Sequence, residues 1–175
     1  MGVLWAVRPG KLVLLCEVDD VGLAEAVSKS LRMVYGLDVE ARMVRLEGAE
    51  RFYNRRRGQY DAAGLISLVS PARGRLFLIL TWRDIYVAGL NYVFGYAPGG
   101  VGIVSTSRLD QRLYTGEYDA NLYLERSVKE AVHEVGHLLG LSHCPDPLCV
   151  MHFSNSIEDT DRKSSRPCTR CMLKI

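Results

Sequence analysis

The sequence lacks the features that mark membrane proteins and nucleic-acid-binding proteins. No apolar run in its 175 residues approaches the length of about 20 residues that a membrane-spanning helix needs. The net charge is only +2, which is too small to favour nucleic acid or an anionic membrane as a partner. Met1–Pro9 has no basic stretch ahead of its apolar residues and no small-residue cleavage pattern. We therefore expect a cytoplasmic protein with no nucleic-acid partner and no membrane partner.

Cysteine is scarce and unevenly placed, with five residues in the whole chain. Cys16 stands alone in an apolar stretch and is expected to be a small buried residue on a strand. The other four lie near the C-terminus, at Cys144, Cys149, Cys168 and Cys171. An odd number of cysteines, four of them clustered, fits a metal site better than a disulfide framework. A metal site is also the more common use of such cysteines in a reducing compartment.

The first hundred residues alternate between strand patterns and helix patterns. Short apolar or alternating runs predict strands, and apolar residues at helical spacing predict helices between them. Gly36 is placed to cap the first helix, and Pro71 to stop the second. The polar and basic stretch 51–58 is expected to be a solvated loop. The predicted strands are 11–18, 37–46, 76–80 and 101–105, and the predicted helices are 21–35 and 61–69.

A further helix is predicted over 128–139. Ser127 is a suitable N-cap, and Glu130 three residues later would complete a capping box. The segment is apolar nearly all round, which indicates a buried helix. It nevertheless carries His133, Glu134 and His137, which are costly to bury unless they have partners.

The spacing of these polar residues predicts a zinc site. His133 and His137 are four residues apart and share one helix face, so both can bind one metal ion. His143 can join them only if the helix stops, and Gly140 is placed to stop it. Three neutral imidazoles leave one position of a tetrahedral zinc open for water. Glu134, beside that position, would act as general base in hydrolysis.

Two alternatives to a catalytic site would also place histidines on this helix. The first is a chance occurrence of His133 and His137 on a helix, as core or surface residues that bind no metal. The extended pattern through Gly140 and His143 is far more specific than such a pair. A non-catalytic zinc protein that binds peptides or a partner would also explain the histidines. Glu134 favours the enzyme, because a pure binding module has no need of a carboxylate beside an open metal position.

The four late cysteines predict a second, structural zinc. Consecutive side chains in an extended segment point apart, so Cys144 would face away from a metal held by His143. With Cys149, Cys168 and Cys171 it can close a tetrahedral four-thiolate site. The alternative is a set of free or disulfide-paired cysteines. The expected cofactors are therefore two zinc ions, one catalytic and one structural.

The run from His133 to Cys144, followed by the later cysteines and Met151, resembles the archaemetzincins, a branch of the metzincin zinc metallopeptidases. The stretches 57–60 and 89–95 are similar to that family as well. The resemblance implies an α/β (α+β) fold with a twisted mixed sheet, backing helices and an active-site helix. It implies an N-terminal part over 1–143 and a small zinc-stabilised part over 144–175, within one compact catalytic domain. It also implies a peptide or protein substrate, with strand 101–105 lining the cleft.

Three consecutive residues between Cys149 and Cys168, namely Met151, His152 and Phe153, complete the expected site. Met151 fits the methionine turn of the metzincins, a packing role beneath the metal. Two residues later, where astacin-like enzymes carry a tyrosine, this chain has Phe153, which has no hydroxyl to assist the reaction. His152 is interpreted as solvent-facing or structural, because no spacing argument makes it a ligand.

Overall fold

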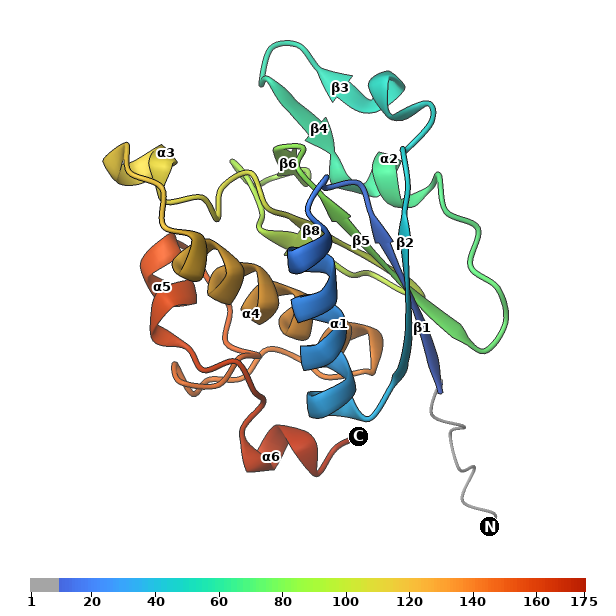
Figure 1. The fold of residues 1–175 in the computed structure, drawn as a ribbon, viewed down its shortest axis with the longest axis vertical. Coiled ribbons are helices and arrows are strands. Elements are labelled where there is room, and N and C mark those ends of the chain that lie inside the picture. The colour runs from blue at the N-terminus through green and yellow to red at the C-terminus, as the bar shows by residue number, and fades with distance from the viewer. Residues whose placement is uncertain (1–9) are drawn as a thin grey trace.

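A five-stranded mixed sheet forms the centre of the structure, a computed structural model that describes residues 10–175 (Figure 1). Four of its strands are parallel, and the edge strand β7 runs antiparallel to β8. The prediction for Met1–Pro9 lies outside the described residues. The strand order is β2 (Asp38–Met43), β1 (Lys11–Cys16), β5 (Arg75–Thr81), β8 (Val101–Ser105) and β7 (Gly95–Tyr96). The expected mixed sheet is confirmed.

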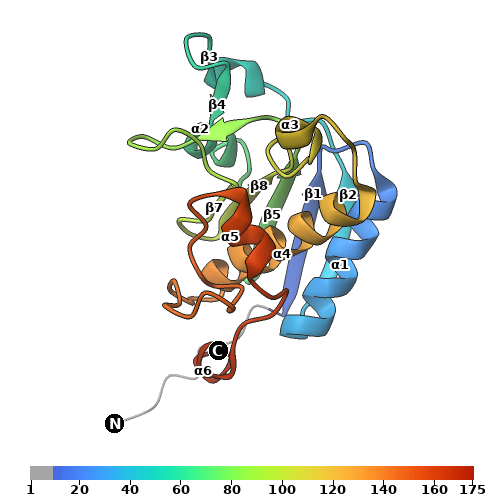
Figure 2. The same ribbon diagram turned by 90° about the vertical axis from the view of Figure 1, so that its left-hand side faces the viewer.

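Helices α1 (Val21–Tyr35) and α4 (Ala120–Leu138) cover one face of this sheet (Figures 1 and 2). α1 has the predicted bounds and ends at Gly36, which takes a left-handed φ of 67°. The Tyr35 hydroxyl donates to the Val132 carbonyl of α4 at 2.8 Å, joining the two helices. Alternate residues of β1 and β5 point into this layer, as the period of a strand requires.

The opposite face of the sheet carries a second, smaller core. In this core, residues of β5 and β8 pack against residues from a three-stranded sheet and two short helices, which lie at one end of the molecule (Figure 1). The predicted solvated loop over 51–58 is only partly a loop, because a helical turn and a strand occupy its first residues. The elements are η1 (Ala49–Phe52), β3 (Tyr53–Asn54), β4 (Gln59–Asp61), α2 (Ala62–Ile66) and β6 (Ile85–Tyr86).

The active-site helix α4 begins earlier than the sequence pattern predicted. Asp119 is the N-cap, and its Oδ1 accepts from the Leu122 N–H at 2.9 Å. Ser127 lies inside the helix and donates to the Tyr123 carbonyl, and Glu130 is buried rather than part of a capping box. The capping prediction was wrong because residues 120–126 also suit a helix and an earlier aspartate was available to start it.

The segment after residue 143 packs on the main core instead of forming a core of its own. Cys149, Val150, Met151 and Ile157 belong to the same buried cluster as the residues of β1 and α1. Its short helices are α5 (Ile157–Arg162) and α6 (Thr169–Met172), and α3 (Arg112–Thr115) precedes α4. Within residues 10–175, none of the helices is both long and apolar enough to cross a membrane.

Candidate metal sites and active-site cleft

Helix α4 and the turn that follows it bring the three predicted histidines together. His133 and His137 lie one helical turn apart on α4, and Gly140, with φ of 94°, ends the helix as expected. The chain then returns so that His143 joins them. One ring nitrogen from each histidine lies within 4.8 Å of those of the other two.

The orientation of two imidazoles is fixed by backbone carbonyls. His133 Nδ1 lies 2.7 Å from the Val150 oxygen, and His137 Nδ1 lies 2.8 Å from the Leu141 oxygen. Since a carbonyl can only accept, each Nδ1 carries the proton and each Nε2 keeps its lone pair. The two Nε2 atoms face each other at 3.0 Å. Two lone pairs at that distance repel each other unless a cation lies between them, so the donor set fits a metal ion.

Burial also keeps these histidines in the form that binds metal. It lowers the pKa of His133 well below its ordinary value, and it lowers the pKa of His137 and of His143. The positive charge of Lys163 acts in the same direction on the pKa of all three. At neutral pH the imidazoles are therefore uncharged, as zinc ligands must be.

Glu134 lies beside the histidines with only 4% of its surface exposed. Burial raises the pKa of its carboxyl group well above the ordinary value, the charge of Glu130 raises it further, and Lys163 opposes both effects. A raised pKa makes a carboxylate a better proton acceptor, which suits a general base.

A cleft of about 490 Å³ opens in front of these groups. One wall is the segment from Leu90 to Ala97, which includes β7, and the other includes Phe153, Ser154 and Asn155. The predicted cleft strand β8 does not line it. β8 lies one strand further in, between β5 and β7, and all its residues are buried, so the expectation for 101–105 was wrong.

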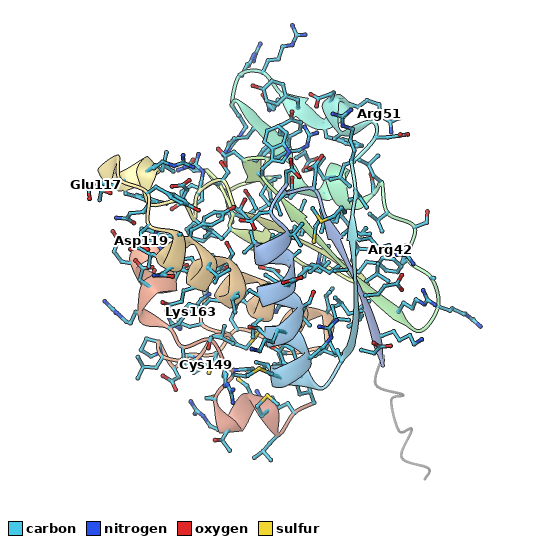
Figure 3. All side chains as sticks on the ribbon, in the orientation of Figure 1. Arg42, Arg51, Glu117, Asp119, Cys149 and Lys163 are labelled. Atoms are coloured by element: carbon cyan, nitrogen blue, oxygen red, sulfur yellow. The ribbon has the colours of Figure 1, made fainter. Side chains whose placement is uncertain are left out.

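A buried ion pair lies next to the histidines and was not found from the sequence. Lys163 Nζ is 2.8 Å from Glu130 Oε1, and the same oxygen accepts from the Thr160 hydroxyl at 3.0 Å. Figure 3 shows Lys163 alongside α4. Glu130 also lines the cleft. Its spacing of four residues before Glu134 is a signal that could have placed it on the site's face of the helix.

The four late cysteines form a second cluster, and Figure 3 shows sulfur atoms gathered near α6, where Cys149 is labelled. All four sulfurs lie within 4.8 Å of one another. Cys144 Sγ is 3.8 Å from Cys168 Sγ, and Cys149 Sγ is 3.9 Å from Cys171 Sγ. These distances exclude disulfides and match the separation of about 3.8 Å between sulfurs of a tetrahedral zinc with Zn–S bonds of about 2.3 Å. The geometry favours a metal site over the disulfide alternative.

The environments of these thiols differ from one another. Burial raises the pKa of Cys149 and raises that of Cys171 to about 12, whereas the Cys171 backbone N–H lowers the pKa of Cys168 to about 6. Since burial disfavours the charged form of Cys149 and Cys171, a bound cation would stabilise their thiolates.

The residues that follow the histidines support the site by packing. Met151 is fully buried against Gly136, where an added Cβ would lie 2.3 Å from the Met151 sulfur. The Phe153 ring meets the His143 ring edge-on at 5.0 Å between centroids. His152 Nδ1 contacts the Cys144 oxygen at 2.9 Å, which is consistent with a structural role.

Fold and site together define a zinc metallopeptidase of the metzincin type. The chain belongs to the archaemetzincins: the sequence model described as Peptidase family M54 matches residues 25–175. The archaemetzincin of Methanopyrus kandleri is 44% identical over 93% of this chain and 88% of its own length. That archaemetzincin's crystal structure superposes with a TM-score of 0.82 and 36% identity, covering 98% of this chain and 96% of that one. A zinc-dependent peptidase from Methanocorpusculum labreanum superposes with a TM-score of 0.80 and 29% identity, over 94% and 99% of the two chains.

Proposed function

We propose that His133, His137 and His143 hold the catalytic zinc of this peptidase and that Glu134 is its general base. The observation that carries the proposal is the convergence of three neutral imidazoles, two with their Nδ1–H groups tied to backbone carbonyls, at the floor of a cleft that also contains Glu134. The substrate is a peptide or protein segment that enters this cleft.

Each group of the proposed site has its own role in hydrolysis. Zinc bound by three histidines would lower the pKa of a coordinated water towards ~7 and polarise the substrate carbonyl. The carbonyls of Val150 and Leu141 hold two imidazoles in the required tautomer. Glu134 accepts a proton as water attacks the carbonyl carbon, and it delivers that proton to the amine that leaves. Phe153 supplies no hydroxyl, so no step depends on a phenol at that position.

The second zinc in the proposal is structural and is held by Cys144, Cys149, Cys168 and Cys171. A shell of four thiolates is closed, so this ion has no position for substrate or water. Its role is to tie the C-terminal segment to the turn that carries His143. The small net charge favours neither a nucleic-acid partner nor an anionic membrane. A cysteine cluster that binds metal instead of forming disulfides suits a reducing compartment, so we propose a cytoplasmic location.

The test is digestion of a broad peptide library, read by mass spectrometry, with zinc-loaded wild type, Glu134→Gln and His133→Ala. Glutamine keeps the size of Glu134 but cannot take a proton, so zinc content and melting should be retained while the rate falls by about two to four orders of magnitude. His133→Ala should lose zinc as well as activity. Full activity of Glu134→Gln would remove the general-base assignment. A loaded wild type that cleaves nothing would favour a non-catalytic zinc protein.

A further inference from the structure

Gly95 of the edge strand β7 lies directly against the carboxylate of Glu134. A Cβ atom added to Gly95 would lie 2.4 Å from Glu134 Oε1, 2.5 Å from its Cγ and 2.6 Å from its Cδ. Since the Cγ is among these atoms, rotating the carboxylate alone cannot relieve the overlap. The whole side chain would have to swing by about 1 Å to restore an ordinary contact of 3.4 Å.

Neither partner in this contact can move easily. Gly95 is paired with Val104 of β8, and the Ser105 N–H donates to the Phe94 carbonyl at 2.8 Å. β8 is itself buried in the middle of the sheet. Glu134 is 4% exposed and belongs to the buried stretch of α4. The contact therefore joins two rigid elements.

The need for glycine at this position is steric and does not come from backbone strain. Gly95 is not among the glycines with positive φ, so its backbone would accept alanine. The other close approach on α4 is the packing of Gly136 on Met151, which involves no polar group of the cleft. Gly95, by contrast, borders the cleft and contacts its buried carboxylate.

We propose that Gly95 is a positioning residue: the bare backbone of β7 is the surface that holds the Glu134 carboxylate in place beside the three histidines. The catalytic consequence rests on the proposed function, in which Glu134 is the general base. The contact itself does not depend on that role. A displacement of about 1 Å in a catalytic group can cost up to two orders of magnitude in rate.

The first arm of the test compares steady-state hydrolysis by Gly95→Ala with that by Gly99→Ala. Gly99 is the matched control, because an added Cβ there meets nothing within 4 Å. Gly95→Ala should lower kcat by about tenfold or more, with KM changed less than about twofold and zinc content retained. Gly99→Ala should behave as wild type. An unchanged kcat in Gly95→Ala would overturn the proposal.

The second arm reads the contact without activity, through a melting cycle of wild type, Gly95→Ala, Glu134→Ala and the double variant. Overpacking should lower the Tm of Gly95→Ala by about 3–8 °C. In the Glu134→Ala background the loss should shrink to about a third or less, because alanine leaves room for the new methyl group. Equal losses in both backgrounds would show that Gly95 acts elsewhere and would also overturn the proposal. Activity of Glu134→Ala would instead refute the proposed function, while the cycle would still report the contact.

Discussion

Lys163 and Glu130 form an ion pair that is almost completely removed from solvent, with exposed side-chain fractions of 0% and 3%. Each charge is acceptable there only because the other lies 2.8 Å away. Glu130 lines the cleft, and the charge of Lys163 lowers the pKa of all three histidines and so favours their neutral form. It therefore links the stability of α4 to the electrostatics of the cleft.

We expect Lys163→Met to destabilise the protein by about 3–5 kcal/mol, because it leaves the Glu130 carboxylate buried without a counter-charge. Replacing both residues, in Lys163→Met with Glu130→Met, should recover most of the loss, since two apolar groups of similar volume need no partner. Denaturant unfolding of the wild type and the two variants measures both effects. If Lys163→Met is as stable as the wild type, the two charges do not depend on each other as the structure indicates.

The active-site helix α4 owes its start to Asp119, which Figure 3 shows at the beginning of the helix. We expect Asp119→Ala to cost about 0.5–2 kcal/mol, the usual range for a lost N-cap. Ser127→Ala should cost less than about 0.5 kcal/mol, because a serine that donates back to the preceding turn adds little to a helix. Urea unfolding of the two variants measures the loss of unfolding free energy in each. A larger loss in Ser127→Ala than in Asp119→Ala would show that Ser127 is the cap.

How far the sequence predicts each element depends on how local its signals are. α1 was predicted at its observed bounds because its apolar spacing and Gly36 are both local. The start of α4 was missed because Ser127 and Asp119 are both suitable capping residues, and the helix begins at the earlier one, Asp119. β7 has only two residues, too few for any periodicity to show. The assignment of strand 101–105 to the wall of the cleft came from the family resemblance, and the structure places β7 there instead.

The same distinction holds for the candidate site. The predicted ligand residues lie close together in two groups, as their spacing on one helix, one turn and one short segment indicates. The contact of Gly95 with Glu134 and the pair of Glu130 with Lys163 join segments more than thirty residues apart. No residue pattern along the chain specifies such contacts, which depend on how the sheet and helices pack.

We predict that the C-terminal segment depends on a zinc ion at the cysteine cluster for full order. Its apolar contacts with the main core come mainly from the stretch 149–157, and we expect these alone to offset the entropy of ordering the segment only in part. We expect Cys171→Ser to give protease cleavage after about Leu148 and weaker zinc binding at the histidine site. Cys16→Ser is the control: its thiol is buried on β1 away from the cluster, so it should alter stability but not metal content. Unchanged melting and metal content in Cys171→Ser would contradict this dependence.

At the scale of the whole molecule, the two metal sites share one stretch of backbone. The Cys144 N–H donates to the Met151 carbonyl at 2.9 Å. The carbonyl of Val150, the residue directly after Cys149, accepts from His133 Nδ1 at 2.7 Å. His143 immediately precedes Cys144 in the chain. The cysteine cluster therefore helps to set the position of the three histidines, although the two proposed sites would hold separate ions.

The two ions should differ in how readily they leave. A four-thiolate shell is closed, whereas a three-histidine site keeps an exchangeable position, so mild chelation should first remove about one zinc per chain. Peptidase activity should fall with this first metal, and the melting temperature mainly with the second. Metal analysis during a titration with chelator follows both steps. Loss of both ions in a single step would contradict the expected difference in how readily the two sites release zinc.

The most direct measurement is anomalous diffraction at the zinc absorption edge from crystals of the zinc-loaded protein. The account predicts two peaks: one bounded by His133, His137 and His143 with Glu134 alongside, and one enclosed by Cys144, Cys149, Cys168 and Cys171. A single ion bound jointly by histidine and cysteine, or a histidine cluster without a peak in a fully active preparation, would contradict it.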